Sequence, residues 1–241
     1  MRDLYDETKK KLELIEFLKM VKTQETYESL SSKLSHVKLS PAIMSRYVNG
    51  RVLPSGKRAE ELMKMLREAY PTETLVETNI SVDERGVVDD TKIISNPSLI
   101  RLLAADCHSA LDVTPDVTLT VAADGIPFAY ELSMVFGTRL AIAKKEREAG
   151  VDQFYEQTEL SLSSGVKEGF YLPKSMLFKG ERVLVADDLA RTGRTIHVLM
   201  GLAKQAGALP VGLALIISTK EAVSGLSGIP TYVGHYVRDP R

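Results

Sequence analysis

Apolar residues recur at helical spacing through the first seventy residues of the chain. Leu12, Ile15 and Leu18 lie on one face of a helix expected over about 7–21. The same spacing predicts three more helices, over about 26–34, 41–49 and 57–69. We therefore expect a small all-α domain over residues 1–70.

The third of these helices has well-marked ends and a polar outer face. Ser40 is an N-cap followed by Pro41, and the pair Asn49-Gly50 is typical of a helix C-terminus. The expected outer face of the helix carries Ala42, Ser45, Arg46 and Asn49, while Ser40 precedes the helix and Arg51 and Lys57 follow it. Short helices with such small and basic outer residues are typical of a helix-turn-helix DNA-binding domain. A helical bundle used for dimerisation or partner docking is the alternative.

Strands and helices alternate in the rest of the chain. Residues 71–95 form a linker with two short strands, and helices follow over about 96–111, 127–136 and 196–205. Strands are expected over 117–122, 139–143, 183–186, 210–217 and 231–237, while residues 146–169 look polar and irregular. This alternation predicts an α/β domain over 96–241, built on a doubly wound parallel sheet.

One stretch, VLVADDLARTGRT at residues 183–195, combines a buried strand, two acids and a short hydroxyl-bearing loop before a helix. Backbone N–H groups in such a loop and the helix dipole favour an anion. Asp187 and Asp188 suit sugar hydroxyls or a magnesium ion instead. The stretch therefore predicts a ribose phosphate ligand at the carboxyl end of a parallel strand.

Charge and composition narrow the class of protein. The formal net charge is −1, but residues 1–70 hold 14 Lys/Arg against 10 Asp/Glu. One cysteine, Cys107, excludes an intrachain disulfide, and the four histidines lack the spacing of metal ligands. Neither a membrane-spanning run nor a signal peptide is evident, so we expect a cytoplasmic protein.

The 183–195 stretch resembles the phosphoribosyl pyrophosphate (PRPP) loop of type I phosphoribosyltransferases. The resemblance implies that the ribose and its 5-phosphate are bound by Asp187, Asp188, Leu189, Ala190, Arg191, Thr192, Gly193, Arg194 and Thr195. If the protein is an enzyme, Asp187 and Asp188 are the expected catalytic residues.

Two further stretches resemble the same family. VTLTVAADGIPFAYELS is similar to its pyrophosphate loop, where a non-proline cis peptide bond is often found, and implies diphosphate binding at Ala123, Asp124 and Gly125. RLAIAKKE resembles the next strand, with Lys144 and Lys145 as cations for the diphosphate. Residues 146–169 correspond to the mobile loop of the family. Asp124 departs from the small or basic residue of catalytic members and disfavours efficient catalysis.

The sequence indicates the nucleobase of the ligand less clearly than its ribose phosphate and diphosphate. Lys220 follows the strand ALIIST, near the place where 6-oxopurine enzymes of the family have a lysine that contacts the base. It is displaced by one residue, and an exposed loop lysine is the alternative. Magnesium would enter together with PRPP, and no separate protein metal site is expected.

The order of the two domains favours a regulatory function over a purely enzymatic one. Residues 10–68 resemble the DNA-binding domain of the phage-repressor family, and 96–237 resemble purine-operon repressors of phosphoribosyltransferase type and related archaeal regulators. We expect a homodimeric transcription regulator that binds a double-stranded DNA operator and senses PRPP or a purine nucleotide. The alternative is an active purine phosphoribosyltransferase with an accessory N-terminal domain.

Overall fold

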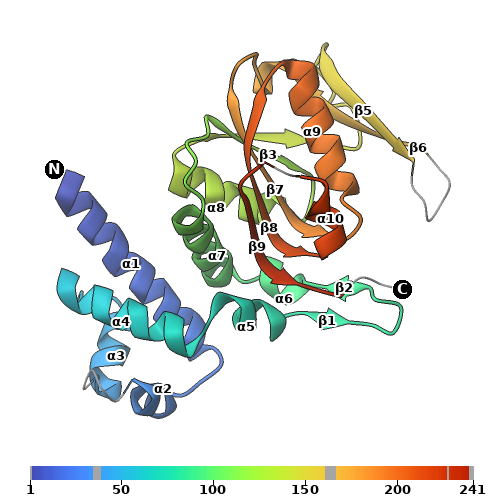
Figure 1. Ribbon diagram of the computed structural model, residues 1–241. Helices are drawn as coiled ribbons and strands as arrows, with labels where there is room; N and C mark the ends of the chain where they lie inside the picture. The colour runs from blue at the N-terminus through green and yellow to red at the C-terminus, as the bar shows by residue number, and fades with distance from the viewer. Residues whose placement is uncertain (1, 35–38, 161–166, 227, 239–241) are drawn as a thin grey trace.

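The computed structural model describes residues 2–34, 39–160, 167–226 and 228–238. The SLSSG segment at 161–165 therefore lies outside the described residues, as does His36. Figure 1 shows the N-terminal helices grouped on one side of the molecule and the sheet with its covering helices on the other.

Four helices form the N-terminal group: α1 (Arg2–Lys22), α2 (Tyr27–Lys33), α3 (Pro41–Val48) and α4 (Gly56–Ala69). The predicted Ser40 cap is confirmed, because its hydroxyl oxygen accepts a bond from a backbone N–H of the first turn of α3. Thr26 caps α2 in the same way. Apolar residues of all four helices enter one core, which includes Leu30, Met44 and Leu62.

Helix α1 packs differently from the sequence prediction. Leu12, expected on the inner face, is 51% exposed, whereas Leu14 and Phe17 are buried. The difference arises because α1 packs against α4 of its own group and also against α7 of the α/β part. A helix with two neighbours buries a wider stripe than one periodic face indicates.

The segment between the two parts is more ordered than a linker. It contains α5 (Thr72–Glu77), the paired strands β1 (Ser81–Val82) and β2 (Val88–Asp89), and α6 (Thr91–Ile94). The two strands were predicted, but the two short helices were not. Leu75, Val76 and Ile93 from these helices are buried in the core that also holds the N-terminal helices.

The α/β part is built on a five-stranded sheet in the order β4-β3-β7-β8-β9, and every adjacent pair is parallel. The strands are β3 (Val117–Val121), β4 (Arg139–Ala143), β7 (Arg182–Ala190), β8 (Leu209–Ser218) and β9 (Thr231–Tyr236). The predicted fold class is confirmed.

Helices cover both faces of this sheet. Alternate residues of a strand point to opposite faces, so Leu184 and Ala186 of β7 join the core beneath α7 (Pro97–Ala110) and α8 (Ile126–Phe136). Val183 and Val185 join a second core beneath α9 (Arg194–Ala206). The near-continuous apolar strands of the sequence reflect this burial on both faces.

The prediction that residues 146–169 are irregular is partly wrong. These residues contribute to an antiparallel hairpin of β5 (Phe154–Leu160) and β6 (Lys167–Pro173), which projects beside the sheet (Figure 1). Many side chains of β5 are exposed, so its pattern is weak, although Phe154 and Tyr155 are residues that favour strands. A 3₁₀ turn (Lys174–Met176) follows the hairpin, and α10 (Lys220–Ser224) follows β8.

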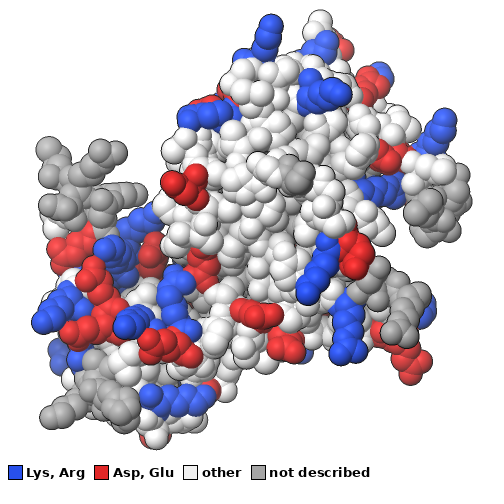
Figure 2. Space-filling model, in the orientation of Figure 1, with Lys and Arg blue, Asp and Glu red and all other residues white. Residues whose placement is uncertain are grey.

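Charged residues of both signs mix over the visible surface of the N-terminal helices, whereas the middle of the same face is largely uncharged (Figure 2). No helix among the described residues is long and apolar enough to cross a membrane.

Candidate functional site

A cavity of 320 Å³ opens at the carboxyl ends of β3, β4 and β7. The residues that line it are Val121, Ala122, Ala123, Asp124, Gly125, Lys145, Glu168, Phe170, Asp187, Asp188, Leu189, Arg194 and Thr195. The segments that follow β3, β4 and β7 therefore meet at one edge of the sheet, and Glu168 and Phe170 of β6 join them there. This is where ligands bind in open parallel α/β sheets.

The loop after β3 forms the first wall of the cavity. The peptide bond between Ala122 and Ala123 is cis, as the family resemblance implied. Gly125 follows at the start of α8. An added Cβ there would lie 2.6 Å from Asp187 Oδ1 and 2.7 Å from Thr120 Oγ1, so only glycine fits at this position.

The end of β7 forms the second wall, and the strand is longer than predicted. It continues through Asp187, Asp188 and Leu189 to Ala190, because the long neighbour β8 goes on pairing with it. The loop expected over 189–195 is therefore confined to residues 191–193, and α9 begins at Arg194. Both acids belong to the strand end and not to the loop.

Asp187 is the most buried acid of the site, at 4% exposure. Burial, and then the neighbouring carboxylate of Asp188, raise the pKa of Asp187 well above its usual range. The Thr195 side chain hydrogen-bonds Asp187 and partly offsets this rise. Asp187 is thus held in place by α9 and by the close approach of Gly125, while Asp188 is the more accessible acid.

Hydrogen bonds from the end of β8 and from the residue after it hold the 191–193 loop in place. Thr219 Oγ1 donates to the Arg191 carbonyl at 2.8 Å, and Ser218 Oγ donates to the Ala190 carbonyl at 3.2 Å. Gly193 has a φ of +72°, and an added Cβ there would lie 2.8 Å from the Ala222 carbonyl oxygen. The loop backbone therefore needs glycine for both its conformation and its packing.

Cations from two elements reach the cavity, and both are paired with one acid. Glu168 Oε2 lies 2.8 Å from an Arg194 guanidinium nitrogen and 3.6 Å from Lys145 Nζ. Lys144 does not line the cavity. Its Nζ pairs with Glu148 at 2.8 Å, and its backbone bridges to Tyr171 on β6.

Sequence reasoning missed two acids, Glu168 in the cavity wall and Asp90 beside the cavity. Asp90, just before α6, hydrogen-bonds Asp188. Burial first, and then the charge of Asp188, raise the pKa of Asp90 to about 6. One Asp90 oxygen is buried without a partner within the described structure. No sequence signal marks Asp90, because β1, β2 and α6 bring it to the site only in three dimensions.

The remaining predicted residues lie nearby without lining the cavity. Arg191, Thr192 and Gly193 form the loop, and the last two line a second hollow between α9 and α10. Ala190 is buried, and Lys220 is exposed at the start of α10. Lys220 is not part of the cavity wall.

Helix α3 presents the predicted DNA-facing residues. Ala42, Arg46 and Asn49 are exposed, as are Ser40, Arg51 and Lys57, while Ser45 is half-buried. The Asn49 amide donates to the Ser45 carbonyl at 2.7 Å and to the Ser45 hydroxyl at 3.2 Å. Arg46 is therefore the exposed cation of α3 itself, and Arg51 and Lys57 follow after it.

The acids of the cavity do not build a dedicated metal site. Among the described ranges, no three His, Cys, Asp or Glu side chains are grouped to hold a metal ion. Magnesium commonly uses one or two carboxylates together with ligand phosphates. Asp188 and Asp124 fit that mode, in which the metal arrives with the ligand.

Comparison with known families identifies the class of proteins that share this fold and this cavity. The phosphoribosyl transferase domain model matches residues 91–226. This is more than half of the chain, so the protein belongs to the phosphoribosyl transferase domain family. The adenine phosphoribosyltransferase of Thermoanaerobacter pseudethanolicus has the same fold, with a TM-score of 0.60 and 17% identity over 68% of this chain and 98% of that one.

Curated relatives include regulators and enzymes. The transcriptional regulator GfcR of Methanospirillum hungatei is 23% identical over 64% of this chain and 71% of its own length. The purine biosynthesis transcriptional repressor PurR of Bacillus subtilis is 26% identical over 56% of this chain and 48% of its own length. A hypoxanthine/guanine phosphoribosyltransferase of Methanosalsum zhilinae is 34% identical over 50% of this chain and 60% of the enzyme.

Proposed function

We propose that this protein is a homodimeric transcription regulator whose phosphoribosyltransferase-like domain senses PRPP or a purine nucleotide. The observation that carries the proposal is the joining of two units in one chain. One unit has the exposed helix α3, and the other has the cavity at the end of β7. The similarity to GfcR and PurR supports the regulatory role.

The DNA-binding role rests on α3 and its flanks. Ala42, Ser45 and Arg46 would face base edges or nearby phosphates in the major groove, whereas Asn49, Arg51 and Lys57 would contact the DNA backbone. Charges of both signs cover the N-terminal helices (Figure 2), so bulk charge alone would bind DNA weakly. A dimer would double the contacts and favour a palindromic operator.

The ligand role rests on the way in which different parts of the cavity would bind different parts of the ligand. Asp188 would accept bonds from the ribose hydroxyls, with Asp187 supporting the same strand end. The backbone of 191–195 at the start of α9 would bind the 5-phosphate. The 123–125 loop and Lys145 would bind the diphosphate. Magnesium, when bound, neutralises part of the diphosphate charge.

Catalysis is the second candidate function. The similarity to hypoxanthine/guanine and adenine phosphoribosyltransferases favours it, as does the presence of all three cavity segments. Asp124 argues against efficient turnover, because it is an exposed carboxylate beside the expected diphosphate and would repel it. Incubation with magnesium, PRPP and each purine base, followed by chromatography for nucleotide, tests this. Turnover that is lost in Asp188→Asn would establish the enzyme.

The test of the regulatory role is selection of bound fragments from genomic DNA, followed by anisotropy titration of the selected fragment. We expect Arg46→Ala to weaken specific binding at least tenfold. Lys64→Ala is the control, because it removes the same charge from the exposed face of α4. Equal losses in both variants, or recovery of no preferred fragment at any salt concentration, would contradict the proposal.

A further inference from the structure

The carboxylate of Glu168 on β6 stands between the cations of the ligand cavity. It lies 2.8 Å from Arg194 at the start of α9 and 3.6 Å from Lys145 after β4. Arg194 also lies over the ring of Phe170, two residues further along β6, with 5.9 Å to the ring centroid. One strand therefore supplies both an acid and an aromatic surface to the same guanidinium.

Glu168 engages the positive charge that the cavity offers. Lys145 and Arg194 are the Lys and Arg side chains of its wall, within the described part of the chain. The wall also holds the acids Asp124, Asp187 and Asp188. Lys144, the other predicted diphosphate cation, is paired with Glu148. An anion that enters therefore meets cations already neutralised by carboxylates.

A carboxylate and a phosphate compete for the same donors. Both accept charge-assisted hydrogen bonds from guanidinium and ammonium groups, and an Arg fork fits either. Glu168 is about one-third exposed, and Lys145 is more exposed than that. Partly exposed ion pairs are weak, so a ligand with several anionic contacts can replace this carboxylate.

We propose that Glu168 is an internal counter-ion of the cavity, which an anionic phosphate ligand must displace from Lys145 and Arg194 in order to bind. This inference rests on the proposed phosphate-ligand class, and it adds a residue that sets affinity and selectivity. Small anions that offer one phosphate gain too little to displace Glu168. A ligand with a diphosphate, a ribose and a 5-phosphate makes enough additional contacts to do so.

The test is calorimetric titration of the full-length protein and of Glu168→Gln with PRPP and with inorganic pyrophosphate, each with magnesium. Glutamine keeps the shape and removes the charge. We expect Glu168→Gln to bind both ligands about 5- to 10-fold more tightly, which corresponds to loss of one partly exposed ion-pair competitor. The fold gain should be similar for the two ligands, because each must displace the same carboxylate from Lys145 and Arg194.

Glu159→Gln is the matched control. Glu159 faces Glu168 across the hairpin and pairs with His197 at 3.2 Å, but it does not line the cavity. The two variants lose the same charge from the same hairpin. Tighter binding in Glu168→Gln alone, with unchanged melting temperature, supports the counter-ion role, because a merely structural ion pair would not oppose the ligand.

Three other outcomes overturn the inference and separate it from the proposed function. Wild-type binding of PRPP that Glu168→Gln leaves unchanged or weakens refutes the counter-ion role and leaves the sensor intact. Equal gains in both glutamine variants show only a general charge effect. Absence of binding by every variant refutes the PRPP ligand together with the role of Glu168.

Discussion

The guanidinium of Arg101 on α7 lies 3.2 Å from the carboxylate of Glu131 on α8. The same guanidinium lies 3.5 Å from Glu16 on α1, and Ser98 also donates to Glu16 at 3.1 Å. Helix α8 starts at the 123–125 loop of the cavity, and α1 belongs to the N-terminal helices. Arg101 therefore connects the ligand-binding wall with the proposed DNA-binding domain.

This connection predicts that Arg101→Gln weakens the coupling between ligand and DNA. A coupling free energy requires contacts that differ between two states, and Arg101 joins the elements that would move. We expect PRPP to change operator affinity at least threefold less in the variant than in wild type. The affinities for PRPP alone and for DNA alone should stay within twofold, measured by calorimetry and anisotropy. An unchanged PRPP effect would exclude this route.

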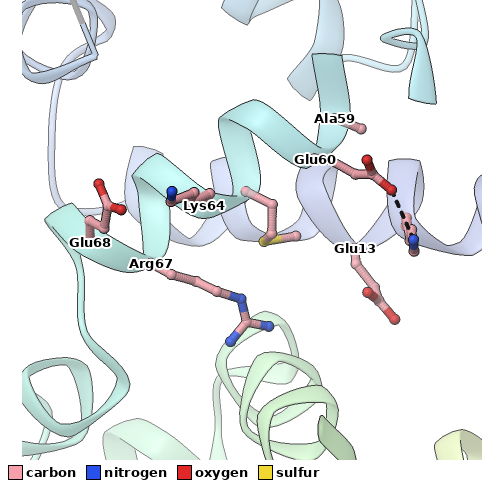
Figure 3. A pocket seen from close by; sticks show the side chains of 8 residues that line it. Glu13, Ala59, Glu60, Lys64, Arg67 and Glu68 are labelled. Carbon is pink, nitrogen blue, oxygen red and sulfur yellow. Dashed lines mark hydrogen bonds and ion pairs between the residues drawn. The ribbon is translucent and has the colours of Figure 1, made fainter. Parts of the chain in front are cut away.

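A second ion pair fastens α4 to α7. Arg67 of α4 points toward the green helices of the α/β part (Figure 3) and pairs with Asp106 of α7, which also accepts from Thr72. Residues of α1 and α4 also line a groove of 540 Å³, and Lys10 pairs with Glu60 across it at 2.9 Å. The dashed line at Glu60 in Figure 3 marks this pair. Asp106 is buried, so its removal leaves two donors without an acceptor.

We therefore expect Asp106→Ala to lower the free energy of unfolding by about 2 kcal/mol, because loss of a buried acceptor costs more than loss of an exposed pair. Urea denaturation measures the change. Asp112→Ala, at an exposed position just past the end of α7, should change it by less than about 0.5 kcal/mol. Similar losses in both variants would show that the Asp106 contacts contribute nothing specific.

Gly193→Ala tests the phosphate loop. The variant would place a Cβ at a φ of +72° and 2.8 Å from the Ala222 carbonyl oxygen. We expect a loss of about 2–3 kcal/mol in stability, from backbone conformation and a steric clash together, and at least tenfold weaker PRPP binding. Gly150→Ala is the control, because its φ is +83° but nothing lies within 4 Å of the added Cβ. It should lose only the conformational part, about 1 kcal/mol.

The raised pKa of Asp90 predicts a pH dependence. Its pKa rises from 3.8 to about 6 in the folded protein, so the folded state holds the proton more tightly than the unfolded chain. Stability contributed by this group therefore falls as pH rises from about 4 through about 6. At pH 7.5 the ionised, half-exposed Asp90 costs about 1–2 kcal/mol after solvent screening is considered.

Asp90→Asn should accordingly raise the melting temperature at pH 7.5, and this gain should fade as pH falls toward 4. Asp89→Asn is the control with the opposite sign. Hydrogen bonds from Thr91 lower the pKa of Asp89, so its loss should slightly destabilise the protein at pH 7.5. A gain for Asp90→Asn that does not vary with pH would contradict the assigned cause.

The parts of the fold that follow from local physics were predictable. Buried parallel strands appear as apolar runs, and helix ends at Ser40 and Asn49 carry their own caps. The site could be predicted from the acids and the glycine-containing loop at 187–195, because strand, loop and helix follow one another directly in the sequence there. The resemblance also implied a non-proline cis peptide bond in the loop around 123–125, and the structure has one between Ala122 and Ala123.

The parts set by long-range contacts were not predictable. Leu14 and Phe17 are buried because α1 has two packing partners, and β7 extends to Ala190 because β8 is long enough to pair with it. Asp90 and Glu168 reach the cavity from elements that no local pattern ties to it. The part that Asp90 and Glu168 play in the site thus became visible only in three dimensions.

The most direct test of the central claim is the effect of PRPP on operator affinity. A fragment selected from genomic DNA is titrated with full-length protein by fluorescence anisotropy, with and without magnesium and PRPP, at fixed salt. The account predicts sequence-specific binding whose Kd changes at least fivefold with PRPP, and no such change in Asp188→Asn. Specific binding that neither PRPP nor any purine nucleotide alters would contradict the proposed sensor.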